Sequence, residues 1–252
     1  MWNPVLYLAA FAAFPAVFGQ EARIINGNLV DTLRRFPHHV TIKIGDDFCS
    51  GSIISDKWIL TSLSCVDKGI EGKEYQIMFH RRYLWDNRDS FSVSVPESAV
   101  TRYPTGYDDI ALIKLPIYLV FTDEIKPIKL GGKPFNDLVV MAGFNDYSSK
   151  DLTYGMFALA SKNVCKRDYG SEFDEYLQLC TLGWRNNNQA PCTHDEGGGL
   201  VTGWPTQPRL IGVLSRSTSC KEAAPAVFTD VNKYLDWMIS VTGNDLLIEW
   251  DN

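Results

Sequence analysis

The sequence predicts an all-β fold, either an antiparallel barrel or a sandwich, with one helix near its C-terminus. Beyond residue 24, short apolar or alternating runs are separated by clusters of Gly, Asn, Asp and Pro. Such regular spacing of short strands and turns is typical of antiparallel β architectures. The chain contains no internal repeat and no low-complexity tract, so a solenoid or a disordered region is not expected.

Six runs predict strands, and one later segment predicts a helix. The runs cover residues 40–44, 58–61, 92–95, 110–115, 138–141 and 210–214. In the helical segment, apolar residues recur at the i, i+3, i+4 spacing of one helix face. These residues are Val231, Tyr234, Leu235, Met238, Ile239 and Val241.

Composition excludes several classes of function. The 252 residues carry 24 Lys and Arg against 30 Asp and Glu, a net charge of −6, and no basic block stands out. A general binder of nucleic acid, heparin or anionic membranes is therefore not expected. A chain of this length buries enough surface to fold without a metal, so its six cysteines need another explanation.

The N-terminus predicts a secretory signal peptide over residues 1–19. An apolar run from Val5 to Phe18 is too short to span a bilayer and ends in a small residue, although no Lys or Arg precedes it. A buried N-terminal helix is the alternative. No later stretch reaches transmembrane length, so we expect a secreted, soluble protein. Its even number of cysteines then predicts disulfides, for which spacing alone leaves 15 connectivities.

Four separated segments resemble the trypsin-like serine proteases, over about Ile24 to Val241. They are Arg23–Gly27, Trp58–Cys65, Asp108–Leu112 and Cys192–Leu200. The resemblance implies a propeptide at 20–23 and a peptidase-homology domain at 24–252. It also implies two packed antiparallel β-barrels, roughly 24–125 and 126–240, followed by the C-terminal helix.

The same resemblance implies how the chain is processed and cross-linked. Cleavage after Arg23 would free the amino group of Ile24. In this family the new amino group pairs with the aspartate that precedes the nucleophile, which here is Asp195. The family's disulfide pattern uses all six cysteines. It pairs Cys49 with Cys65, Cys165 with Cys180, and Cys192 with Cys220.

The catalytic positions implied by the resemblance have lost two of their three side chains. The family needs a histidine base, an orienting aspartate and a serine nucleophile. This chain has Ser64, Asp109 and Glu196 there, and none of its four histidines stands at the base position. A serine hydroxyl has no useful basicity, and a carboxylate at 196 would repel a developing oxyanion. We therefore predict that this chain has no peptidase activity.

The cleft is altered beyond these three positions. A glycine of the oxyanion loop is replaced by His194, and the aromatic residue of the cleft wall is replaced by Arg216. We expect the pocket for the substrate side chain to be narrowed or filled, through either drift or selected closure. The pocket positions that the family pattern assigns are Ala190, His194, Ser215, Arg216, Ser217 and Ala226.

An unconventional enzyme site is one alternative. Asp109, Glu196 and His194 could together form a metal or acid–base site, because carboxylates with a histidine can bind a divalent cation. Asp195 is expected to pair with Ile24, however, and no metal signature is present. We therefore expect neither metal nor cofactor.

Two stretches are candidate exosites, because Arg, Tyr and Trp dominate binding hot spots. The alternative for the first stretch is a hairpin with snorkelling arginines. The first comprises Arg81, Arg82, Tyr83 and Trp85, and the second runs from Trp184 and Arg185 to Gln189.

The residues alone indicate a pseudoprotease that works by binding, competition or scaffolding. The chain is most similar to the mite group 3 allergen family, and within it to the inactivated serine protease paralogues of the scabies mite. That resemblance implies a secreted, gut-derived monomer that binds host proteins, in particular complement components, and blunts their activity. It implies no nucleic-acid or membrane partner.

Overall fold

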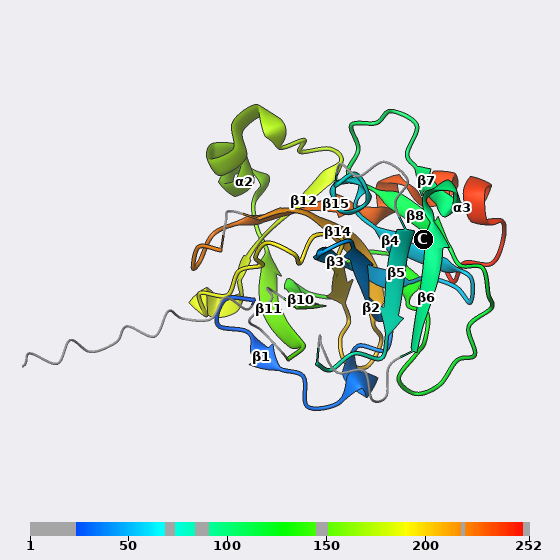
Figure 1. The fold of residues 1–252 in the computed structure, drawn as a ribbon. Coiled ribbons are helices and arrows are strands. Elements are labelled where there is room, and N and C mark those ends of the chain that lie inside the picture. Colours follow the sequence, from blue (N-terminus) through cyan, green and yellow to red (C-terminus); the bar gives the residue numbers. More distant parts are fainter. Residues whose placement is uncertain (1–23, 69–73, 84–90, 145–150, 218–219, 249–252) are drawn as a thin grey trace, which may run out of the picture.

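The computed structural model describes residues 24–68, 74–83, 91–144, 151–217 and 220–248. The predicted signal peptide and propeptide, with Arg23, lie outside these ranges, as does Trp85. Within them the chain forms two antiparallel β-barrels and a short C-terminal helix, which confirms the predicted fold class (Figure 1).

The first barrel is a seven-stranded sheet in the order β6-β5-β2-β3-β4-β8-β7. Every pairing in it is antiparallel, and neighbouring strands are mostly consecutive in the chain. Its strands are β2 (His39–Ile44), β3 (Asp47–Ile53), β4 (Trp58–Thr61), β5 (Glu74–Phe79), β6 (Phe91–Pro96), β7 (Val100–Arg102) and β8 (Ala111–Lys114).

The second barrel is an eight-stranded sheet in the order β1-β11-β10-β13-β14-β15-β12, in which β9 also pairs with β14 and β12 returns to β11. Only the β9–β14 pairing in it is parallel. Its strands are β1 (Asn28–Leu29), β9 (Lys129–Leu130), β10 (Leu138–Gly143), β11 (Thr153–Leu159), β12 (Gln178–Gly183), β13 (Gly199–Thr202), β14 (Arg209–Ser217) and β15 (Ala226–Asp230).

All six predicted strand segments are strands, and the predicted helix is α3 (Leu235–Thr242). The first residues of its apolar pattern form a 3₁₀ turn instead. A second helix, α2 (Lys162–Tyr169), was not predicted, because only Cys165 on it is buried and it lacks an apolar face. The remaining helical turns are α1 (Leu63–Val66), η1 (Leu33–Arg35), η2 (Glu97–Ala99), η3 (Gly170–Glu172), η4 (Trp184–Asn186) and η5 (Val231–Lys233).

The N-terminal residues depart from the predicted division of the chain into halves. Asn28 and Leu29 pair with Tyr154 and Thr153 of β11, and Ile24 is buried in the core of the second barrel. The chain therefore begins on the second barrel before it builds the first, so residue 24 is not the start of the first half.

The three implied disulfides are confirmed as Cys49–Cys65, Cys165–Cys180 and Cys192–Cys220. The first joins β3 to α1, and the second joins α2 to β12. The third joins the segment before β13 to the segment before β15. Each closes a loop of 15 to 28 residues, which in the chain-entropy account is worth about 3 kcal/mol.

Candidate functional site

Ser64 and Asp109 meet where the β4–β8 strand pair ends. Ser62 caps α1 by accepting from the Cys65 amide at 3.1 Å, which fixes Ser64 on the first turn after β4. Asp109 stands two residues before β8, the antiparallel partner of β4. The Ser64 hydroxyl donates to Asp109 Oδ2 at 3.0 Å, and the Ser64 amide donates to Oδ1 at 2.6 Å. The carboxylate is therefore bound by the residue that replaces the base.

The second barrel also holds Asp109 in place. The Thr229 hydroxyl of β15 donates to the backbone carbonyl of Asp109 at 2.9 Å. Burial raises the pKa of Asp109, and hydrogen bonds from Ser215 and Ser64 partly oppose that rise. Asp109 is therefore a hydrogen-bonded carboxylate held by residues of both barrels.

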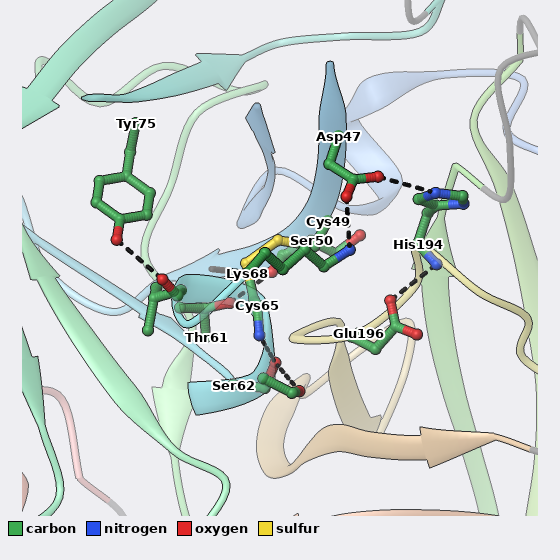
Figure 2. Close-up of a disulfide and its surroundings, with 12 residues drawn as sticks. Asp47, Cys49, Ser50, Thr61, Ser62, Cys65, Lys68, Tyr75, His194 and Glu196 are labelled. Carbon is green, nitrogen blue, oxygen red and sulfur yellow. Dashed lines mark hydrogen bonds and ion pairs between the residues drawn. A yellow bond between two sulfur atoms is a disulfide. The ribbon is translucent and has the colours of Figure 1, made fainter. Parts of the chain in front are cut away.

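The side chain of Glu196 turns back onto its own loop. Its Oε2 accepts from the backbone amide of His194 at 2.8 Å, while its own carbonyl accepts from the Ser50 amide at 2.9 Å (Figure 2). In trypsin-like enzymes such backbone N–H groups bind the oxyanion of the reacting carbonyl. Here one of them already binds a fixed carboxylate.

His194 is held by contacts with the first barrel. Its φ of 75° lies in the left-handed region, which costs a residue other than glycine about 1–2 kcal/mol. Its ring stacks on Phe48 with centroids 4.8 Å apart, and its Nε2 lies 3.4 Å from Asp47 Oδ1. Figure 2 shows that Asp47 also faces Lys68, at 4.0 Å. These contacts secure the oxyanion loop in a conformation that family members reach with glycine.

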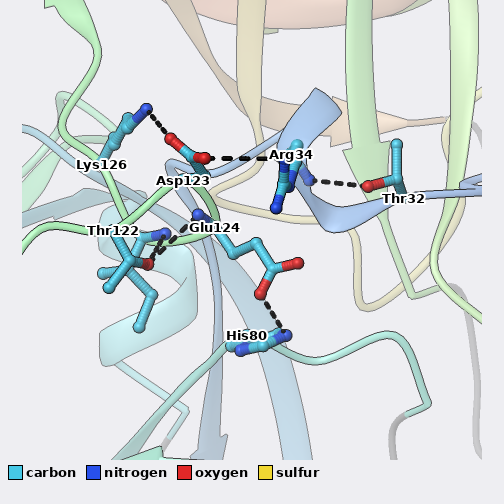
Figure 3. Close-up of polar contacts among 8 residues, drawn as sticks. Thr32, Arg34, His80, Thr122, Asp123, Glu124 and Lys126 are labelled. Carbon is cyan, nitrogen blue, oxygen red and sulfur yellow. Dashed lines mark hydrogen bonds and ion pairs between the residues drawn. The ribbon is translucent and has the colours of Figure 1, made fainter.

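All four histidines lie within the described residues, each in its own surroundings. His38 and His39 are buried in the first barrel, and burial lowers their pKa values to about 4 and about 3. His80 Nε2 lies 3.0 Å from Glu124, beside the Arg34–Asp123–Lys126 group (Figure 3).

Asp195 is fully buried beneath this loop. The Cys192 amide donates to its Oδ2 at 3.0 Å, whereas its Oδ1 has no hydrogen-bond partner in the described part of the chain. Burial raises the pKa of Asp195 to about 8, and the neighbouring charge of Glu196 adds to the rise. Gly143 makes room for the carboxyl, because a Cβ there would lie 2.0 Å from Oδ1.

Ile24 lies near this carboxyl on the same strand pair. A Cβ at Gly155 of β11 would meet Ile24, and one at Gly143 of β10 would meet Asp195. Met141 pairs with Gly155 in the β10–β11 register and Gly143 lies two residues beyond Met141, so the two glycines are diagonal neighbours across this pair. Ile24 and the Asp195 carboxyl therefore pack over neighbouring positions of the β10–β11 pair.

Gln189, which the sequence analysis placed at the end of the second candidate exosite, is instead a buried positioning residue. Its side-chain amide donates to the Asn26 carbonyl at 2.6 Å, and its Oε1 accepts from the Met156 amide at 2.6 Å. The Ile25 amide donates to the Ala190 carbonyl at 2.9 Å alongside it. Nothing in the local sequence marks a glutamine in a loop as buried, so no signal could have found it.

The predicted pocket positions lie in β14, at the start of β15 and in the segment before β13. Ala190 and Ala226 are buried, and Ser217 faces Ala226 across the β14–β15 pair. Arg216 stands where the family pattern has an aromatic residue, and its guanidinium forms an ion pair with the Glu172 carboxylate of η3. Ser215, also in β14, is buried.

One of the candidate exosite residues is unsuitable for binding. Arg81 is only 6% exposed, so it does not present its charge on the surface, and its inclusion in the exosite was wrong. Arg82 and Tyr83 are exposed, with the guanidinium 5.5 Å from the ring centroid. In the second stretch, Arg185 lies 5.3 Å from the Trp184 ring.

The three groups of the alternative enzyme site do not converge on one point. Asp109 binds Ser64, His194 faces Asp47, and Glu196 binds the His194 backbone. The described residues contain no group of three His, Cys, Asp or Glu side chains able to hold a metal ion. In the same ranges no helix is long and apolar enough to cross a membrane.

Comparisons with known proteins agree with this geometry. The Trypsin family model matches residues 24–238. A collagenase of Hypoderma lineatum is 29% identical, over 94% of this chain and 96% of its own, and trypsin II-P29 of Gallus gallus is 26% identical, over 92% and 93%. A solved structure of HL collagenase has the same fold, with a TM-score of 0.72 at 24% identity, covering 86% of this chain and 98% of that one. This chain therefore belongs to the trypsin family.

Proposed function

We propose that this protein is a catalytically inactive member of the trypsin family that acts by binding other proteins. The observation that carries the proposal is the Glu196 carboxylate, which occupies the nucleophile position and accepts a hydrogen bond from the His194 amide. A carboxylate held there cannot form the acyl ester on which this chemistry depends, and its charge opposes an oxyanion.

The base position supports the same proposal. The Ser64 hydroxyl donates a hydrogen bond to Asp109, and a neutral hydroxyl is too weak a base to take the proton of a nucleophile. In subtilisin, loss of either the serine or the histidine alone costs about 10⁶-fold in kcat. Both are replaced here, and the oxyanion loop is altered as well.

Its partners, on this proposal, are host proteins, and complement components in particular. This part of the proposal comes from the resemblance to the inactivated scabies mite paralogues. The three disulfides and the trypsin-like fold indicate an extracellular protein, where such partners are met. The binding surfaces that we assign are the exposed pair Arg82–Tyr83 and the exposed Arg185 with the half-buried Trp184. A structural or other protein-binding role in the gut lumen is the alternative.

A serum pull-down with mass spectrometry, followed by a complement lysis assay, tests the proposal. We expect complement components to be captured and lysis to fall at micromolar protein. Arg82→Glu and Arg185→Glu should weaken capture more than Glu196→Gln, with Lys166→Glu on the exposed face of α2 as the charge-matched control. If complement components are not captured and lysis is unchanged, the inhibitor proposal fails and the structural role is favoured. Loss of capture in Glu196→Gln alone would return binding to the cleft.

A further inference from the structure

The segment that follows β8 presents a row of apolar side chains to solvent. Tyr118 is 68% exposed and Val120 84% exposed, and Ile117 and Phe121 beside them are also exposed. Leu119 between them is buried in the core of the first barrel and anchors the segment. Single exposed apolar residues are ordinary, whereas a contiguous set of them marks an interaction site.

This row is fixed in place by backbone hydrogen bonds. The Leu119 amide donates to the Asp56 carbonyl at 2.7 Å, and the Leu115 amide donates to the Lys57 carbonyl at 2.8 Å. The apolar side chains therefore belong to an ordered segment that runs along residues 56 and 57. A surface organised in this way needs little further ordering when it binds.

Two lysines flank the apolar row. Lys57 Nζ lies 4.1 Å from the centroid of the Tyr118 ring, and Lys114 Nζ lies 5.5 Å from that of Trp58. Neither lysine makes an ion pair within the described ranges, unlike Lys126 nearby, which pairs with Asp123 at 2.8 Å. The chain as a whole has a net charge of −6, so two lysines without carboxylate partners make this surface locally basic beside its exposed apolar side chains.

Between the lysines lies a shallow depression of about 310 Å³. Apart from Lys57 and Lys114, its lining is apolar, and no carboxylate takes part. The other lining residues are Pro96, Ala99, Leu115 and Pro116. A pocket of this size suits an apolar side chain, and the cations at its edges suit a carboxylate beside that side chain.

We propose that the Lys57/Lys114/Tyr118/Val120 surface docks an acidic segment of a partner protein that carries aromatic or aliphatic side chains. Charge complementarity selects the carboxylates, and the depression and the apolar row receive the apolar groups. An anionic membrane is a poorer occupant, because lipid-binding clusters use about 4–8 basic residues and the chain as a whole is acidic.

The docking surface is remote from the degenerate cleft. Trp58 pairs with Lys114 at one end of the β4–β8 pair, and Thr61 pairs with Ala111 at the other, next to Ser64 and Asp109 (Figure 1). Three steps along a strand separate the ends by about 10 Å. The proposal stands whether or not complement is a partner.

The test measures binding of a random copolymer of glutamate and tyrosine to the purified full chain by fluorescence anisotropy. Polyglutamate and polylysine are the comparison probes. We expect the copolymer to bind at least tenfold more tightly than polyglutamate, and polylysine, tested by itself, not to lose affinity in the variants that follow. The double variant Lys57→Glu/Lys114→Glu and the double variant Tyr118→Ser/Val120→Ser should each weaken copolymer binding at least tenfold.

A matched control exists on the other barrel. Lys233 Nζ lies 4.1 Å from the ring of the exposed Tyr176, so Lys233→Glu/Tyr176→Ser removes the same kind of pair elsewhere, and its affinity should stay within twofold of wild type. Equal losses in the control and test variants, or no loss in the test variants, would overturn the proposal. So would tighter binding to phosphatidylserine vesicles than to the copolymer, or self-association through these residues seen by sedimentation. Circular dichroism confirms that each variant is folded.

Discussion

At position 196 a charged side chain occupies the place where a trypsin-like enzyme binds its reacting carbonyl. A hydrogen bond from the His194 amide to the Glu196 carboxylate is charge-assisted, and such bonds contribute about 1.5–3 kcal/mol. A peptide carbonyl, which is neutral, would have to displace it. The sequence predicted a charge that repels the oxyanion, and the structure adds that this charge is bonded to one of the oxyanion donors.

Restoring the two missing catalytic side chains tests the residue-scale account. We expect Ser64→His with Glu196→Ser to restore little peptidase activity. His194, at a φ of 75°, still shapes the oxyanion loop, and loss of a single oxyanion donor alone costs about 10²–10³ in kcat. The measurement is hydrolysis of trypsin- and chymotrypsin-type peptide esters.

The control adds Ala226→Gly to the double variant, because Ala226 and Ser217 face one another across the pocket wall. This triple variant should exceed the double variant if the pocket is filled. Full activity of the double variant alone would show that the pocket and loop changes do not matter.

The contacts of His194 show where sequence reasoning reaches its limit at this scale. The family pattern identified the replaced glycine, but not that the imidazole stacks on Phe48 or lies beside Asp47. Those partners stand in β3, far away in the sequence. The same limit hid the burial of Arg81, since an arginine among aromatic residues looks like a surface group.

Among the elements, the N-terminal segment and the loop around Asp195 form one coupled unit. Asp195 carries a carboxyl whose Oδ1 has no hydrogen-bond partner in the described residues, next to the segment that starts at Ile24. Removal of one partner of a buried ion pair costs about 3–5 kcal/mol. Cleavage after Arg23 by another trypsin-like enzyme should therefore stabilise the protein, once the new amino group pairs with Asp195.

The pH dependence of this unit gives the sharper prediction. In the uncut chain burial raises the pKa of Asp195 from 3.8 to about 8. As the pH rises, the unfolded state therefore loses the Asp195 proton before the folded state does. Stability should then fall as the pH rises, until about 8. In the cut chain that fall should disappear. Melting temperatures at pH 6.5 and 8 measure this, and uncut Asp195→Asn is the control that should also lack it. Equal pH dependence in cut and uncut protein would contradict the pairing.

The elements differ in how well the sequence predicts them. Strands such as β2, β8 and β10 bury apolar runs, and those runs are visible in the sequence. Helix α2 is tied to the barrel through Cys165 and its disulfide to Cys180, so its position depends on a cross-link and not on periodicity. The return of Asn28–Leu29 to the second barrel depends on long-range pairing that no local pattern encodes.

On the scale of the whole molecule, two buried histidines make the first barrel sensitive to acid. Burial lowers the pKa of His38 to about 4 and that of His39 to about 3, from a usual 6.5. Below pH 6.5 these two histidines bind protons in the unfolded chain but not in the folded chain. Each histidine should then remove about 1.4 kcal/mol of stability per pH unit until its folded pKa is reached.

Urea denaturation of the cut protein between pH 7 and 4.5 measures this loss. The variant His39→Gln should reduce the loss of stability between pH 7 and 4.5 by about half. An equal loss in wild type and variant would show that other groups control it.

The central claim, that this member of the trypsin family binds without cutting, is tested most directly by an activity assay on the cut protein. Peptide esters of both specificities and an active-site phosphonate probe are used, with trypsin as the positive control. The account predicts turnover no higher than in buffer and no covalent labelling, because Ser64 and Glu196 stand at the base and nucleophile positions. Saturable turnover that follows the protein through purification and is blocked by the phosphonate would contradict it.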